Sequence, residues 1–134
     1  MSVRSDILAD IEAVLGGVPA IQTVKVGSLE EVDLEEIDIP VVFVLSGPER
    51  KIPGSTEHET WEWTVVVETW CKDTDIETLY AATHAAMAAD PTRGGKAYDC
   101  ERTAGDILSV DPGRALAALQ QTYTIKYRHP LGSP

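Results

Sequence analysis

Cysteine, positive charge and long apolar runs are all scarce in this sequence. Cys71 and Cys100 are its only cysteines, and two isolated thiols in a reducing compartment are usually small packing side chains. The longest apolar stretches, at residues 40–45 and 63–67, are far shorter than the roughly 20 residues that a helix needs to cross a bilayer. We therefore expect neither a disulfide-stapled scaffold nor a membrane-spanning helix.

Basic residues are heavily outnumbered by acidic ones. Lys and Arg total 11 against 22 for Asp and Glu, which gives a formal net charge of −11. Such a chain repels phosphate backbones, so we do not expect it to grip nucleic acid. The first residues also lack the basic, then apolar, then small-residue order of a secretory signal. We therefore expect folding in the cytoplasm.

Motifs that carry chemistry are missing as well. The sequence contains no glycine-rich phosphate loop, nucleophile elbow, paired-cysteine zinc spacing or calcium loop. The one string near a metal motif, at residues 58–62, lacks a second histidine and begins a strand, so the helical spacing of such motifs fails there. His84 and His129 have no sequence-local partner for acid–base work. We expect no enzyme activity, no metal and no cofactor.

Two apolar stripes at helical spacing are present. The first predicts a helix that begins after Ser2 as its N-cap and ends at Gly16-Gly17. The second predicts a helix that starts after Asp73 or Asp75 and stops before Asp90-Pro91. The stripes consist of Val3, Ile7, Leu8, Ile11, Val14, Leu15 and Val18, and of Ile76, Leu79, Tyr80, Thr83, Ala86 and Met87.

Segments with β-branched or alternating composition predict the strands. We expect a short strand around residues 21–27 and a buried strand over 39–45 that ends at Ser46-Gly47-Pro48. An exposed loop over 49–58 leads into a strand over 60–71. After the second helix, residues 93–96 predict a turn. Extended chain follows, with alternation at 107–110, a reversal at Asp111-Pro112-Gly113 and a long strand over 116–127. A helical start at 114–121 is the alternative for the last run, which is rich in helix formers.

These elements predict an α+β fold with a mixed, mainly antiparallel β-sheet flanked by two principal helices. The length of 134 residues is typical of one domain, so we expect a single domain over residues 1–134. Residues 129–134 contain two prolines and a glycine, which do not extend a ladder. We expect them to form a flexible C-terminal tail.

Three stretches are candidate interaction surfaces. One face of the strand over 60–71 mixes carboxylates with apolar residues, and either a helix or another subunit covers it. A loop tip with basic charge is either a docking site or an ordinary solvated loop. An acidic run between two apolar segments is either a solvated connector or a functional wall. The residues are Val66, Glu68 and Trp70 for the first, Arg50, Lys51 and Ile52 for the second, and Glu30, Glu31, Asp33, Glu35, Glu36 and Asp38 for the third.

The order of several local strings resembles that of the tail terminator proteins of long-tailed bacteriophages. The likeness covers nearly the whole chain, from the amphipathic N-terminal helix onward. Its strings are Val18-Pro19-Ala20, Ile39-Pro40-Val41-Val42 followed by a polar hairpin, residues 88–97 at the end of the second helix, and residues 123–128.

The resemblance implies a structural virion protein without catalytic residues. Copies would close into a hexameric ring at the end of the tail tube, stop its polymerisation and offer a joining surface to the head or neck. Its partners would be other copies of itself, the tail tube protein and the neck connector, after assembly in the host cytoplasm. DNA would only pass through the lumen, and the acidic run would line that lumen and repel it.

Other functions remain open on the sequence. Within the same class, the chain is a head–tail connector or tail-completion protein. In a different class, it is a cytoplasmic module that binds a peptide or small ligand through a sheet edge or a pocket.

Overall fold

The computed structural model describes residues 3–21, 23–26, 40–53, 58–72, 75–95, 97–111 and 116–130. Its elements are α1 (Val3–Gly16), β1 (Thr23–Val26), β2 (Val41–Ile52), β3 (His58–Lys72), α2 (Ile76–Ala88), β4 (Asp99–Asp111) and β5 (Leu116–Pro130). The strands form one sheet in the order β1-β2-β3-β5-β4. β1 runs parallel to β2, and the other neighbouring strands are antiparallel. The predicted α+β fold with a mixed, mainly antiparallel sheet is confirmed.

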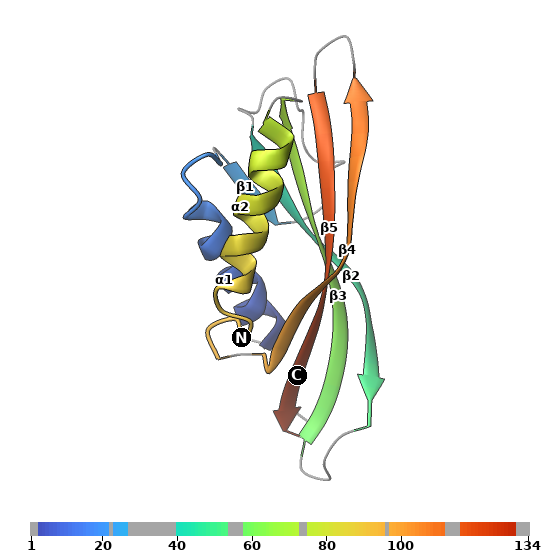
Figure 1. Ribbon diagram of the computed structural model, residues 1–134. Helices are drawn as coiled ribbons and strands as arrows, with labels where there is room; N and C mark the ends of the chain where they lie inside the picture. Colours follow the sequence, from blue (N-terminus) through green and yellow to red (C-terminus); the bar gives the residue numbers. More distant parts are fainter. Residues whose placement is uncertain are drawn as a thin grey trace.

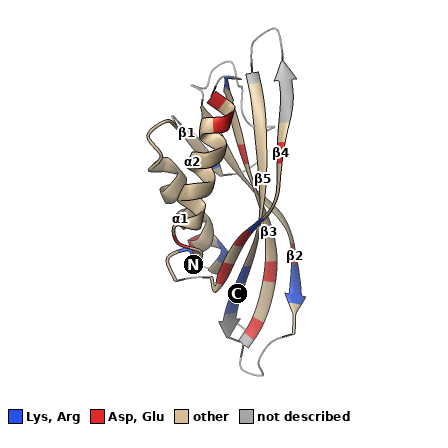
Figure 2. Ribbon diagram, viewed as in Figure 1, with Lys and Arg blue, Asp and Glu red and all other residues tan. Residues whose placement is uncertain are grey.

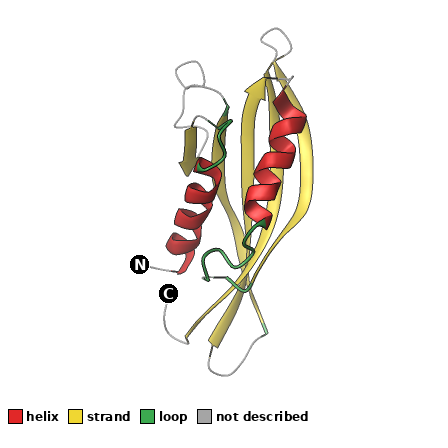
Figure 3. Ribbon diagram, turned by 60° about the vertical axis from the view of Figure 1, so that its left-hand side comes forward, coloured by secondary structure: helices red, strands yellow, loops and turns green. Residues whose placement is uncertain are grey.

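Both helices lie on the same face of the sheet (Figures 1 and 3). Ile7, Ile11 and Leu15 form the buried stripe of α1, while Leu79 and Met87 are buried on α2. The predicted apolar stripes therefore face the core. Neither of the two described helices is long and apolar enough to span a membrane.

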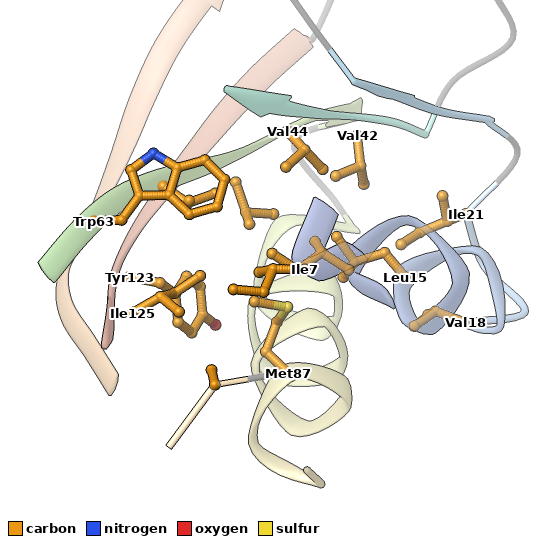
Figure 4. Close-up of a cluster of buried hydrophobic side chains, with 14 of the residues drawn as sticks. Ile7, Leu15, Val18, Ile21, Val42, Val44, Trp63, Met87, Tyr123 and Ile125 are labelled. Carbon is orange, nitrogen blue, oxygen red and sulfur yellow. The ribbon is translucent and has the colours of Figure 1, made fainter. Parts of the chain in front are cut away.

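The core lies between these helices and alternate residues of the strands (Figure 4). Trp63, Val65 and Val67 of β3 point toward the helices, as the alternation of that strand predicts. Tyr123 and Ile125 of β5 join them from the neighbouring strand. Each fully buried side chain of this size contributes about 1.5–3 kcal/mol of burial free energy.

We call the opposite side of the sheet the far face. Because side chains alternate along a strand, it carries every second residue of each ladder. Its members include Val41, Phe43 and Leu45 of β2, Glu62, Thr64, Val66, Glu68 and Trp70 of β3, and Ala118, Gln120, Thr122, Thr124 and Lys126 of β5.

Strand β2 continues past the point where the sequence predicts its end. Ser46-Gly47-Pro48 was expected to stop it, but β2 runs to Ile52 with a register shift between Ser46 and Glu49. The bulge accommodates Pro48, whose missing N–H would interrupt regular pairing. A Cβ on Gly47 would lie 2.8 Å from the carbonyl oxygen of Thr64, so only glycine allows this close approach of β2 to β3.

The predicted exposed loop over 49–58 is therefore wrong for its first part. Arg50, Lys51 and Ile52 are strand residues that pair with Glu62, Trp61 and Thr60. The cause is the bulge, which restores pairing after Pro48 instead of ending it. These residues lie at the end of β2 that projects away from the helices (Figure 1).

Strand β5 continues two residues into the segment expected to form a tail. His129 and Pro130 pair with Glu59 and His58 of β3. The ladder of β4 with β5 starts only at Lys126, so beyond that residue β5 pairs only with β3 among the described residues. Proline is tolerated where a strand has a free side. Residues 131–134 lie outside the described residues.

Several other predictions lie outside the described residues. They concern Ser2 as an N-cap, Asp73, the reversal at Pro112-Gly113 and the acidic run of Glu30, Glu31, Asp33, Glu35, Glu36 and Asp38. Asp75, the other predicted cap, does occupy the N-cap position of α2, although its side chain makes no capping hydrogen bond.

Candidate functional site

The far face brings two of the three predicted interface residues into contact. Nε1 of Trp70 donates a hydrogen bond to Oε1 of Glu68 at 2.7 Å. Nε2 of Gln120, on the adjacent strand β5, donates to Oε2 of Glu68 at 2.8 Å. Both carboxylate oxygens of Glu68 thus accept a hydrogen bond, as expected for a residue that is only 4% exposed. Hydrogen bonds to a charged acceptor are strong, so this arrangement fixes the orientation of the Trp70 indole.

Val66 extends the same surface along β3. It is half-buried, as is Trp70, and it pairs with Leu45 of β2. The side chains of Phe43 and Val41 beside this strip are fully buried. The far face therefore combines a buried apolar base with half-exposed apolar side chains held in place.

The predicted docking residues split between the two faces. Arg50 lies on the far face and contacts Glu62 at 3.2 Å, whereas Lys51 points to the helix side and lies 3.7 Å from Glu59. Their side chains stay 73% and 58% exposed. Exposed pairs of this kind contribute little stability, about 0–1 kcal/mol, so both cations remain accessible to a partner.

A polar network on the helix side of β5 was missed by sequence reasoning. Nε2 of Gln121 donates to Oγ1 of Thr83 at 2.5 Å, and Thr83 donates to the carbonyl of Leu79 at 2.7 Å. NH1 of Arg102 donates to Oε1 of Gln121 at 3.0 Å. Gln121 shares its side of β5 with core residues, and a glutamine on an inward parity was the available signal for a buried hydrogen-bonded group.

Two titratable groups complete this network. Nδ1 of His84 lies 3.0 Å from the hydroxyl of Tyr123. Burial, with a smaller contribution from Arg102, lowers the pKa of His84 below its ordinary value. Burial raises the pKa of Tyr123, so both groups are neutral near pH 7. The neutral side chains of Tyr123 and His84, together with the amide of Gln121, thus hold α2 in place on the sheet.

A second buried polar group joins the turn after α2 to α1. The side chain of Arg93 is fully buried and donates to the carbonyl oxygens of Met87 and Asp90. Its NH1 lies 3.5 Å from Oδ2 of Asp10. The sequence predicts the turn but gives no signal that its arginine points inward.

The Cys100 thiol has no activated character. Cys71 is buried, and burial raises the pKa of Cys100 to about 11. A thiol with such a pKa carries little thiolate at neutral pH. Across the described ranges, no group of three or more His, Cys, Asp or Glu side chains is placed to hold a metal ion.

A small hollow lies between the start of α2 and the segment that precedes β2. It has a volume of about 190 Å³ and is lined by Ala20, Pro40, Asp75, Thr78 and Leu79. Ligand pockets usually measure about 300–1,000 Å³ and combine apolar walls with several convergent polar groups. The far face is thus the stronger candidate for function.

Comparisons with known proteins find a distant likeness in structure. No protein-family model matches the sequence, and no curated protein matches it. A chain in the solved structure "Virion of native gene transfer agent (GTA) particle" is similar with a TM-score of 0.45 and 12% identity, over 96% of this chain and 92% of that chain.

Proposed function

We propose that this chain is a structural virion protein that assembles as a ring on the end of a phage tail tube. In that place it would end tube polymerisation and form the joining surface for the head or neck. The observation that carries the proposal is the pair of Trp70 and Glu68 on the far face, beside the half-exposed Val66. The order of strings that resembles tail terminators supplies the biological setting.

The far face has the physical character of a protein interface. Tryptophan combines a large apolar surface with one polar N–H and is enriched at the centre of interfaces. Here that N–H is already bound to Glu68, so little side-chain freedom remains to be lost on association. Such preorganisation lowers the entropic cost of binding.

The hairpin of β2 and β3 supports a second contact. Its end projects beyond the helices and carries the exposed Arg50 and Lys51 (Figure 2). In a protein with a net charge of −11, two exposed cations at this end favour contact with acidic groups of a partner such as the tube or neck protein. Charge reversal at Lys51, which points to the helix side, would lengthen tails by weakening the cap; tails of normal length would contradict docking there.

The acidic run at residues 30–38 has a proposed role in the same ring. If its carboxylates line the lumen, every copy adds negative charge to a wall that repels DNA and lets it slide. A ring structure with these residues on the outer rim would overturn this part of the proposal.

The ring is tested by native mass spectrometry and negative-stain imaging of the purified chain. We expect ring-shaped oligomers of uniform mass for the natural sequence. Val66→Arg and Trp70→Ala should abolish them, because one inserts a charge into the contact and the other removes its largest apolar side chain. Ala81→Arg, on the exposed side of α2, is the control and should assemble normally.

The two possible contradictions are distinct. A natural chain that stays monomeric at every concentration overturns the ring itself. Rings that persist in both far-face variants leave the ring standing and show that another surface holds it together.

A further inference from the structure

One row of residues crosses the sheet with alternating charge. Arg50 of β2 pairs with Glu62 of β3, Glu62 with Lys126 of β5, and Lys126 with Asp99 of β4. All four lie on the far face, since partners in a ladder share a face. The row therefore reads positive, negative, positive, negative from one edge of the sheet to the other.

The two ends of this row lie on strand edges. β4 is the last strand of the sheet, and β1 pairs only with Val41, Val42, Phe43 and Val44 of β2. Residues 45–52 of β2 therefore have no neighbour on that side within the described residues. Arg50 ends the row on this segment, with 73% of its side chain exposed, and Asp99 ends it on β4.

The directions of the strands suit edge-to-edge pairing between copies. β3 is antiparallel to β2, β5 to β3 and β4 to β5. It follows that β4 runs antiparallel to β2. When a second copy is placed beside the first with the same strand axis and the same face, its β2 meets β4 in the antiparallel sense that ladders favour.

From this geometry we propose that β4 of one copy pairs with residues 45–52 of β2 in the next copy, with Asp99 beside Arg50. This inference rests on the proposed ring and adds an edge contact to the one made by the far face. The pairing continues the alternation of charge from one sheet into the next. It is heterologous, because two different edges meet, and a heterologous contact generates a ring when its rotation closes.

Further acidic residues on β4 support its pairing with the β2 edge that carries Arg50. Glu101 and Asp106 lie on the far face with Asp99, opposite Thr124 and Gln120 of β5. Ile107 of the same strand, on the helix side opposite Leu119 of β5, is 50% exposed. Charges on edge strands also serve to prevent unwanted pairing, so the experiment must separate specific partnership from simple protection.

Two single charge reversals, tested alone and as a mixture, distinguish a specific contact between copies from simple protection of the edge. In Asp99→Arg the β4 edge becomes basic while Arg50 is retained, so identical copies present like charges to each other. In Arg50→Asp both edges are acidic. In an equimolar mixture each variant finds the opposite charge on both of its edges. Opposite charges therefore meet only where one variant lies beside the other, and in a ring in which the two variants alternate this is true of every contact.

We expect each variant alone to need about tenfold or more protein for ring formation than the natural chain, as like-charge juxtaposition opposes association. The equimolar mixture should restore rings with the natural assembly concentration, and native mass spectrometry should show equal numbers of both variants in them. Glu12→Arg on α1 and the double variant Ala81→Glu/Ala85→Glu on α2, all at exposed positions, change the net charge equally and should assemble as the natural chain does.

Each other outcome overturns the inference in a recognisable way. If the natural chain forms rings and both single variants do so equally well, this edge contact is wrong and the proposed function stands. If neither variant forms rings alone and their mixture forms none either, Asp99 and Arg50 do not face each other between copies. If the natural chain forms no ring, the proposed function fails together with the contact.

Discussion

NH1 of Arg93 lies 3.5 Å from Oδ2 of Asp10, which ties the turn after α2 to the middle of α1. The backbone around this contact is shaped for it. Arg93 has a φ of 50°, and Gly94 and Gly95 follow with φ of 70° and 87°. Asp90 holds the start of the turn by accepting hydrogen bonds from the Thr92 side chain and backbone and from the Gly94 backbone.

Removal of this arginine should destabilise the fold strongly. Arg93→Met leaves two carbonyl oxygens of the α2 terminus without their donor and a partly buried carboxylate without its opposite charge, which costs about 3 kcal/mol of unfolding free energy. Arg93→Lys retains the charge but lacks the planar fork, so an intermediate loss is expected. Urea unfolding measures both. A loss below about 1 kcal/mol for Arg93→Met would show that water replaces the guanidinium at little cost.

The hydrogen bond between Thr83 and Gln121 should show coupling between its two ends. Gln121→Leu leaves the Thr83 hydroxyl without its donor, and Thr83→Val leaves a buried amide unsatisfied. Each single change should cost about 1–3 kcal/mol. The double variant should lose less than the sum, by about 1 kcal/mol, because neither orphaned group remains. Additive losses in urea unfolding would contradict the predicted coupling.

His84 should make the free energy of unfolding depend on pH in mildly acidic solution. Its pKa is lower in the folded chain than its ordinary value of 6.5, through burial and then Arg102. The unfolded chain therefore takes up the proton first, so the contribution is complete above the unfolded pKa and is lost as the pH falls below it.

The comparison that isolates this effect uses His84→Gln. We expect the natural chain to lose more stability than His84→Gln between pH 7.5 and pH 5.5, as measured by the urea midpoint. The carboxylates are common to both proteins and cancel in the comparison. Parallel midpoints over this pH range would show that His84 titrates alike in the folded and unfolded chains.

Gly47 should tolerate no side chain. In Gly47→Ala the new methyl group would lie 2.8 Å from the carbonyl oxygen of Thr64, and the backbone must shift to relieve this overlap. We expect a loss of about 1–3 kcal/mol, typical of overpacking. Gly16→Ala is the control, since a Cβ there meets no atom within 4 Å. Equal stability of both variants would contradict the strict requirement at Gly47.

Alternation and helical periodicity predicted the elements that face a core. The Trp61 to Val67 alternation of β3 and the Ile7, Ile11 and Leu15 stripe of α1 correspond to burial in the structure. These patterns are local consequences of one buried side, so a single sequence carries them.

Features that depend on tertiary pairing were not predictable in the same way. The string Ser46-Gly47-Pro48 is typical of a strand end, and only the pairing with β3 makes it a bulge. Likewise, Arg93 sits in a glycine-rich turn, and the carbonyl oxygens that hold it are brought there by the end of α2. The hydrogen bond between Gln120 and Glu68 was also not visible in the sequence, because Gln120 comes from a strand 52 residues away.

The strand order has a consequence for how the chain reaches this fold. β5 follows all the other strands in the sequence yet lies between β3 and β4, and its ladder joins His58 to Pro130. The loop between such distant residues must close before the ladder can form, and contacts of this kind slow folding. During synthesis β3 and β4 therefore wait with unpaired edges until β5 leaves the ribosome. An interior strand is therefore the last to join the sheet, and the nascent chain is open to mispairing until then.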